Sequence, residues 1–166
     1  ITTGPRTKEL EKRVAEYVGV NKAVCLNSCT AAMELALRIL GVGPGDEVIT
    51  SAYTYSASAS VIEHVGAEIV LVDTAPDSFE MDYDKLADAI TEKTKVIIPV
   101  DIAGKMCDYD KIYEIVEDKK KLFKANNELQ GLFNRIVVMA DAAHAFGADR
   151  KGKKCGQVAD FTCFSF

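Results

Sequence analysis

The chain has 166 residues, 48% of them hydrophobic and 27% charged, which is enough apolar material for the core of one domain. Its formal net charge of −5 argues against nucleic acid as a partner, and no apolar run approaches the length of a membrane span. Five cysteines without a C-x-x-C pair and only two histidines disfavour a zinc site. The composition therefore predicts a protein of a reducing compartment, the cytoplasm.

Helical and strand patterns alternate along the chain, which predicts an α/β fold with a mostly parallel sheet. Gly19, Asp82 and Asp108 are expected to mark helix ends, Gly19 as a stop and the two aspartates as N-caps. The stretch 124–134 is expected to be a polar surface loop or a helix extension. In chain order, the expected helices are 6–18, 30–40, 55–65, 82–90 and 108 to beyond 121, the expected strands are 23–26, 47–50, 68–72, 95–100, 136–140 and 159–164, and a hairpin turn is expected at 149–154.

The apolar run 136–140 is followed directly by Asp141, with His144 three residues later. Ligands of open α/β sheets bind just beyond the carboxyl ends of strands, and a carboxylate placed there needs a compensating partner. Asp141 is equally suited to cap the next helical turn. The residue alone leaves ligand contact and capping open.

Residues 27–30, Asn-Ser-Cys-Thr, lie between an expected strand and an expected helix. Free N–H groups at a helix N-terminus bind phosphate, and the Ser28 and Thr30 hydroxyls add donors. Simple helix capping by Ser28 or Thr30 is the alternative. No Gly-Lys-Ser/Thr follows, so this is not a P-loop, and the glycine fingerprint of a Rossmann dinucleotide site is absent too.

Tyr55 also follows an expected strand, where an aromatic ring either fills the core or stacks on a flat ligand. A carboxylate that faces a pyridine nitrogen keeps that nitrogen protonated and strengthens the ring as an electron acceptor. A phosphate cradle, a stacking aromatic and an acid for a ring nitrogen together describe a site for pyridoxal 5'-phosphate (PLP).

The segments NSCTAAMELAL, GVGPGDEVIT, TYSASASVIEHVGA, KVIIPVDIAG, ADAAHAFGA and FTCFSF resemble the DegT/StrS-type sugar aminotransferases, PLP enzymes of fold type I. The resemblance runs from about residue 4 to residue 166 and implies a three-layer, mostly parallel α/β fold. It assigns Cys29, Thr30 and Ser165 to the cofactor phosphate and Tyr55 to the pyridine face. It also assigns Asp141 to the ring nitrogen and His144 to the position beside the ring 3-hydroxyl.

Two departures from the family pattern stand out. Cys29 replaces the glycine of a Ser-Gly-Thr turn, so a positive φ there would be strained. The sequence also ends at Phe166, before the Schiff-base lysine of the family motif, so it contains no catalytic residue of its own. We therefore expect residues 1–166 to be a single, partial PLP-binding large domain without the C-terminal small domain.

The resemblance implies that the parent protein is a homodimeric aminotransferase. Its substrates would be a nucleotide-linked keto sugar and an amino-acid donor, and the fragment alone would be inactive without the lysine. A PLP-dependent sugar dehydratase, with histidine in place of that lysine, is the first alternative. A non-catalytic cofactor-binding or incidental fragment is the second, and a Rossmann-like nucleotide-binding domain ranks last.

Overall fold

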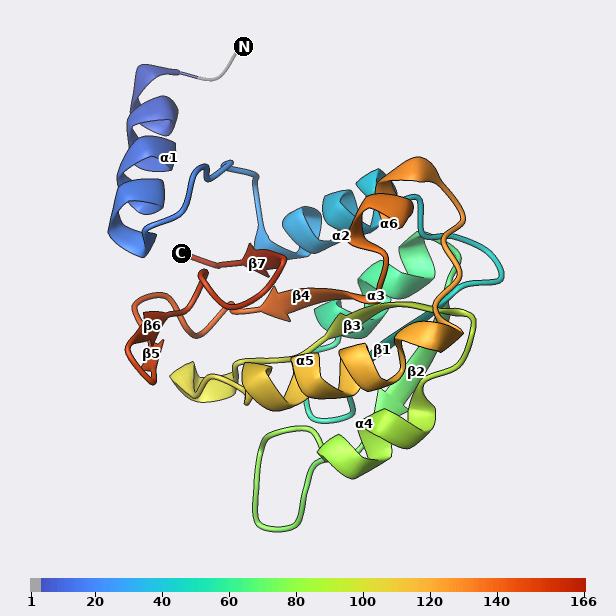
Figure 1. Cartoon of the computed structure of the whole chain (residues 1–166). Helices are drawn as coiled ribbons and strands as arrows, with labels where there is room; N and C mark the ends of the chain where they lie inside the picture. Colours follow the sequence, from blue (N-terminus) through green and yellow to red (C-terminus); the bar gives the residue numbers. More distant parts are fainter. Residues whose placement is uncertain (1–3) are drawn as a thin grey trace.

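In the computed structural model, which describes residues 4–166, five parallel strands form a central sheet in the order β2-β1-β3-β4-β7 (Figure 1). The strands are β1 (Glu47–Ser51), β2 (Glu68–Val72), β3 (Thr94–Ile98), β4 (Val137–Asp141) and β7 (Phe161–Cys163). Every neighbouring pair is parallel, so the carboxyl ends of all five strands meet at one edge. This confirms the predicted α/β class.

Helices cover both faces of the sheet, which explains why β1, β3 and β4 are buried at every position. Helices α2 (Cys29–Ile39) and α3 (Ala57–His64) contact each other on one face, and α4 (Tyr83–Ala89) and α5 (Tyr109–Asp118) lie on the other (Figure 1). Two apolar cores follow, one on each side of the sheet. The result is the predicted three-layer arrangement.

The helix ends carry the expected local signals. Helix α1 (Pro5–Val18) ends at Gly19, whose φ of 83° is left-handed and free of strain only for glycine. The Asp82 carboxylate accepts hydrogen bonds from the first turn of α4, and the Asp108 carboxylate does the same for α5. These predictions are confirmed.

Three predicted segments differ from the structure. Residues 23–26 form no strand: they lie outside the sheet, Val24 is exposed, and the Cys25 N–H donates to a Glu11 side chain instead of a neighbouring strand. Helix α5 ends at Asp118 and is followed by a 3-10 turn, η2 (Lys120–Leu122). Residues 124–134 contain a separate short helix, α6 (Glu128–Phe133), with Gln130 buried.

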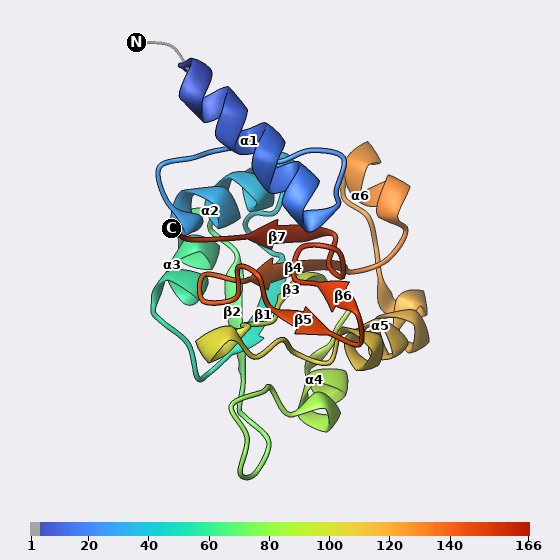
Figure 2. The same cartoon turned by 90° about the vertical axis from the view of Figure 1, so that its left-hand side faces the viewer.

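Helix α1 lies apart from the three layers and crosses near the last strand and the hairpin (Figure 2). The hairpin, which was predicted, consists of β5 (Asp149–Arg150) and β6 (Lys153–Lys154). The Lys154 Nζ donates to the Tyr17 carbonyl at 2.6 Å, and the Gln157 Nε2 donates to the Val18 carbonyl at 2.7 Å. The remaining turn, η1 (Ile102–Gly104), follows β3 at the carboxyl edge of the sheet.

No helix of the described part of the chain is both long enough and apolar enough to cross a membrane.

Candidate functional site

Asp141 is the last residue of β4 and is 6% exposed. Its Oδ2 accepts a hydrogen bond from the Ser58 hydroxyl at 2.6 Å, and its Oδ1 accepts one from the Ala143 N–H at 3.2 Å. Within residues 4–166, no lysine or arginine forms an ion pair with this carboxylate. Asp141 is thus a buried carboxylate that only neutral donors stabilise, and the bond from Ala143 is the local turn contact that the capping hypothesis anticipated.

Ser58 is fully buried in the first turn of α3 and joins that helix to β4. Its Oγ lies 2.7 Å from the Thr54 Oγ1. Because the single Ser58 proton is used toward the carboxylate, the Thr54 hydroxyl must be the donor in that second bond. The chain Thr54 to Ser58 to Asp141 therefore has a fixed hydrogen-bond direction that holds the carboxylate in one orientation.

The N-terminus of α2 lies beside Asp141. The Cys29 Sγ is 3.8 Å from the Asp141 Oδ1 and donates to the Cys163 carbonyl of β7 at 3.2 Å. The Ser28 oxygen caps the helix by accepting from the Ala31 N–H at 3.0 Å, so this part of the capping alternative is correct. The N–H groups of Cys29 and Thr30 belong to the first turn, where a helix offers no acceptor of its own.

The motif at 27–30 reaches this edge by a route that the sequence did not predict. No strand precedes α2 in the part of the chain that the structure describes, so the motif is not a strand-to-helix turn. Packing of Cys29 against β4 and β7 places the helix end there instead, since Asp141 and Cys163 are paired in the sheet.

Cys29 itself adopts the ordinary helical conformation and is 7% exposed. The strain expected from a positive φ is therefore absent, and the thiol packs inward. Burial, and next the negative charge of Asp141, raise the pKa of the Cys29 thiol well above its usual range. The sulfur stays protonated and acts as a packing and donor group, which makes a nucleophilic role unfavourable.

Ser165 lies two residues beyond β7 and is exposed, at the same edge of the sheet as Asp141. Thr30 lies in the first turn of α2 and is half-buried. Within residues 4–166 no hydrogen bond joins the two hydroxyls. The structure thus puts Thr30 and Ser165 on elements that Cys29 connects, without a direct contact between them.

Tyr55 and His144 complete the predicted set. Tyr55 is 78% exposed, so it does not fill the core, and its carbonyl accepts from the Ser58 N–H at 3.2 Å. His144 is exposed, and its Nδ1 accepts from the Ala103 N–H of η1 at 3.3 Å. Both residues are therefore linked to the surroundings of Asp141 at the strand ends.

Sequence reasoning missed Ser58. The stretch 54–60 contains three serines at alternate positions, Ser56, Ser58 and Ser60, and nothing in their spacing singles out one of them. Only the position that α3 takes against α2, β1 and β2 decides that the second serine meets Asp141.

The profile of the DegT/DnrJ/EryC1/StrS aminotransferase family matches residues 1–166. The chain belongs to this family. Among solved structures, it is similar to the PLP-form of a putative sugar aminotransferase, Spr1654 from Streptococcus pneumoniae, with 61% identity and a TM-score of 0.98. That match covers 100% of this chain and 42% of the Spr1654 chain.

Two curated relatives of this chain have the names of specific enzymes. The GDP-perosamine synthase of Caulobacter vibrioides is 42% identical over 158 residues, which are 95% of this chain and 38% of that protein. The UDP-2-acetamido-2-deoxy-3-oxo-D-glucuronate aminotransferase of Pseudomonas aeruginosa is 38% identical over 163 residues, 98% of this chain and 41% of that protein. The chain thus spans about 40% of the length of the relatives that it matches.

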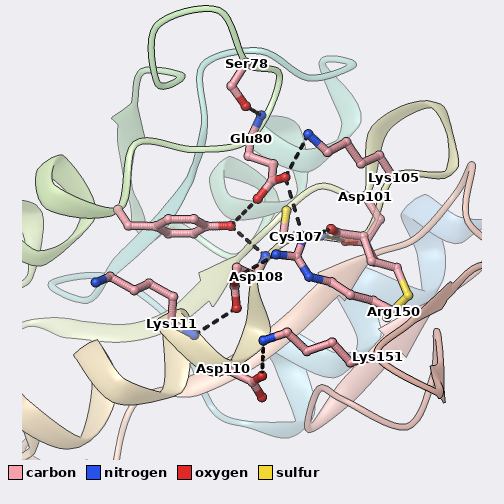
Figure 3. A network of polar contacts seen from close by, with 12 residues as sticks. Ser78, Glu80, Asp101, Lys105, Cys107, Asp108, Asp110, Lys111, Arg150 and Lys151 are labelled. Carbon is pink, nitrogen blue, oxygen red and sulfur yellow. Dashed lines mark hydrogen bonds and ion pairs between the residues drawn. The ribbon is translucent and has the colours of Figure 1, made fainter.

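A second polar cluster of this family member lies on the α4 and α5 side of the sheet and centres on Glu80 (Figure 3). The Glu80 carboxylate accepts from the Tyr83 hydroxyl at 2.7 Å and pairs with the Lys105 Nζ at 3.0 Å. Arg150, from the hairpin, lies 3.6 Å from Glu80 and 2.7 Å from Asp108. We call these five residues the Glu80 cluster; it ties the hairpin to the start of α5.

Burial pushes the pKa of Glu80 upward, but the hydrogen bonds from Tyr83 and Lys105 and the charges of Lys105 and Arg150 outweigh it. The net result is a pKa of Glu80 below the usual value, as for a carboxylate in a satisfied ion-pair network. The cluster is thus internally complete, unlike the surroundings of Asp141.

Proposed function

We propose that this chain forms the cofactor-binding large domain of a PLP-dependent aminotransferase. The observation that carries the proposal is Asp141, a buried carboxylate at a strand end that meets neutral donors and lies beside a helix N-terminus. A buried carboxylate is costly unless its surroundings compensate it, and at the strand ends a protonated pyridine nitrogen is a cation that would do so.

The donor set of this edge suits PLP. The first-turn N–H groups of α2 and the hydroxyls of Thr30 and Ser165 suit a phosphate. The exposed ring of Tyr55 offers a stacking face, and His144 offers a ring nitrogen to the cofactor oxygen. When bound, PLP supplies an aldehyde that carries an amino group and a ring that accepts electrons.

With PLP bound, the residues of this site would have distinct roles. Asp141 holds the proton on the ring nitrogen, which maintains the electron demand of the ring. Ser58 and Ala143 keep the carboxylate oriented toward that nitrogen, and Thr54 keeps Ser58 from rotating away. Cys29, with its proton in place, fills the space behind the phosphate site.

For the whole protein we propose a nucleotide-linked keto sugar as the amino acceptor and an amino acid as the donor. Support comes from family membership and from the relatives, whose names contain GDP- and UDP-linked compounds. The thiols of the five cysteines, none of which forms a disulfide in the described part of the chain, suit the cytoplasm.

We further propose that the protein works as a homodimer. Aromatic rings from three segments, Tyr17, Phe146 and Phe166, form an exposed group in which neighbouring ring centroids are 5.2 and 4.8 Å apart. Tyr55, also exposed, adds apolar surface at the strand ends. Exposed apolar surface of this kind favours association, and a clean monomer of the full-length protein in sedimentation would contradict the dimer.

A titration of the full-length protein with PLP, followed by absorbance, tests cofactor binding. Thr30→Val should weaken binding because it removes a hydroxyl donor, whereas Thr7→Val on the distant α1 should leave it unchanged. An amino-transfer assay with glutamate and a GDP- or UDP-linked keto sugar then tests the reaction. If the protein binds PLP saturably and removes water from the sugar without amino transfer, the aminotransferase hypothesis is wrong and the dehydratase alternative is correct.

A further inference from the structure

Asp101 is a buried carboxylate that the proposed function does not use. It follows β3 and is 1% exposed. Its Oδ1 accepts from the Cys107 N–H at 2.8 Å. Its Oδ2 accepts from the Tyr109 hydroxyl at 2.9 Å and from the Cys155 thiol at 3.4 Å. All of these partners donate, so the carboxylate acts here as an acceptor of several hydrogen bonds.

The Asp101 main chain anchors the start of η1, and the Asp101 carboxylate anchors the segment that follows it. At its start, the Asp101 N–H donates to the Asp141 carbonyl at 2.9 Å, which ties the turn to β4. Beyond it, the chain returns to Asp101 through the Cys107 N–H. Between these two anchors Ala103 adopts a left-handed conformation, with φ of 53°, which a non-glycine residue keeps only where the surroundings impose it.

The anchored turn touches His144. The Ala103 N–H donates to the His144 Nδ1 at 3.3 Å. A Cβ added to Gly104 would lie 3.4 Å from the His144 carbonyl oxygen, so the turn also packs on the His144 backbone. A backbone N–H can only donate, so Nδ1 must present its lone pair, and the hydrogen of the neutral ring must reside on Nε2.

We propose that Asp101 is a positioning residue that selects the Nε2–H tautomer of His144 through the Ala103 N–H. Held in this form, the ring offers Nε2–H as a donor, which suits an acceptor oxygen of a ligand at the strand ends. The inference rests on the proposed function only in naming that acceptor as a cofactor oxygen.

The second histidine provides an internal comparison. The His64 Nδ1 lies 2.8 Å from the Glu34 Oε2, and a carboxylate oxygen accepts. His64 must therefore carry a hydrogen on Nδ1. The two histidines of this chain are thus expected to have opposite hydrogen positions at Nδ1, for reasons that depend only on their neighbours.

Long-range ¹H–¹⁵N spectra of the full-length protein without PLP test the proposal, at a pH of about 8, where ordinary histidine rings are neutral. His64→Gln and His144→Gln spectra assign the two rings. We expect His144 in the Nε2–H form, with a scalar coupling across the hydrogen bond from the Ala103 nitrogen to its Nδ1, and His64 with hydrogen on Nδ1. A His144 ring with hydrogen on Nδ1, or exchanging between tautomers, would overturn the proposal.

Three variants distinguish the effect of Asp101 on the His144 ring from a general effect on folding. Asp101→Ala keeps the backbone bond to Asp141 but removes the carboxylate anchor at Cys107, so it should loosen the far end of the turn, weaken the coupling and let the His144 ring exchange between tautomers. Ala103→Gly keeps the N–H and the left-handed φ, and Tyr109→Phe keeps the Cys107 bond to Asp101, so both should retain the wild-type His144 spectrum. Loss of the coupling in Ala103→Gly would contradict the assigned contact even if Asp101→Ala does not fold.

A separate PLP titration distinguishes the two hypotheses. Failure to bind PLP with His144 in the Nε2–H form would refute the proposed function and leave the tautomer assignment intact. PLP binding by a protein whose His144 ring exchanges between tautomers would refute the tautomer assignment and leave the proposed function intact.

Discussion

Asp141 is a buried carboxylate and Glu80 a partly buried one in the same domain, and their surroundings differ in kind. Glu80 meets two cations, Lys105 and Arg150, and a tyrosine hydroxyl. Asp141 meets a serine hydroxyl, a backbone N–H and a thiol that prefers another acceptor. A carboxylate compensated by cations inside the protein serves the fold. Within the described part of the chain, Asp141 meets neutral donors only and lies at the strand ends beside the N-terminus of α2, where it can meet a cationic ligand.

The largest expected effect comes from Asp141→Asn in the full-length protein. The amide keeps the shape of the carboxylate but cannot hold a proton on a ring nitrogen. Turnover should fall on the order of 10²–10³-fold, as when other preorganised electrostatic groups are removed. Steady-state kinetics measure the loss, and thermal unfolding should show little change. Near-normal turnover would return Asp141 to a purely capping role.

Glu80→Gln should lower stability without affecting the cofactor site, which is the reverse of the pattern expected for Asp141→Asn. It weakens an ion-pair network around a partly buried carboxylate, so the free energy of unfolding should fall by about 1–3 kcal/mol, while PLP affinity stays unchanged. Glu114→Gln, at an exposed ion pair with Lys111, is the matched control and should cost less than about 1 kcal/mol. Urea unfolding of both variants provides the comparison, and equal losses would remove the distinction between the two carboxylates.

The stabilisation by Glu80 should also depend on pH. Because the pKa of Glu80 is lowered in the folded state, its contribution is fully present above the ordinary glutamate pKa, about 4.3, and disappears as the pH falls through the lower folded value. The difference in unfolding free energy between wild type and Glu80→Gln should therefore be constant near neutrality and shrink below about pH 4.3. A difference that grows on acidification would have the wrong sign.

Ser58→Ala should produce a smaller effect at the Asp141 site. It leaves the Asp141 Oδ2 without its protein donor, which costs about 1 kcal/mol and corresponds to a loss of several-fold in turnover. Ser58→Thr keeps the hydroxyl and should restore most of the activity. Ser60→Ala, on the same helix, removes only a bond to the Ser56 carbonyl and should have no effect. Equal losses for Ser58→Ala and Ser60→Ala would show that the helix, and not the bond to Asp141, is responsible.

The smallest expected effect concerns the reactivity of Cys29. Asp141 is one cause of the raised pKa of the Cys29 thiol, after burial, so Asp141→Asn should speed its alkylation modestly. Cys107 is the control, since burial and then Asp101 and Glu80 raise the pKa of its thiol. Mass spectrometry after iodoacetamide treatment measures both. Acceleration of Cys107 to the same extent would indicate general loosening of the fold.

The elements that the sequence predicted are those with strong local signals. Apolar runs such as the one before Asp141 predict buried strands because a parallel sheet is covered on both faces. Asp82 and Asp108 predict helix starts because their carboxylates satisfy local N–H groups. These signals lie within a few residues of one another and need no tertiary information.

The features that the sequence did not predict depend on contacts between distant segments, or on their absence. Residues 23–26 have strand-like composition but no neighbouring strand to pair with. Gln130 is buried because its side chain reaches the Leu40 carbonyl, far away in the sequence. Ser58 contributes to the candidate site only because α3, packed against α2, β1 and β2, brings it to Asp141. For the candidate site, the sequence predicted Asp141 at a strand end. The hydrogen bonds from Ser58 and Thr54 that orient its carboxylate emerged only from the structure.

A crystal structure of the full-length protein with PLP is the most direct test of the central claim, which is that Asp141 and the α2 N-terminus together form a cofactor site. We expect the pyridine nitrogen within about 3 Å of an Asp141 oxygen, the length of an ordinary charged hydrogen bond, and the phosphate at the first turn of α2. PLP bound with its phosphate at α2 but its ring nitrogen away from Asp141, or bound elsewhere on the protein, would contradict it.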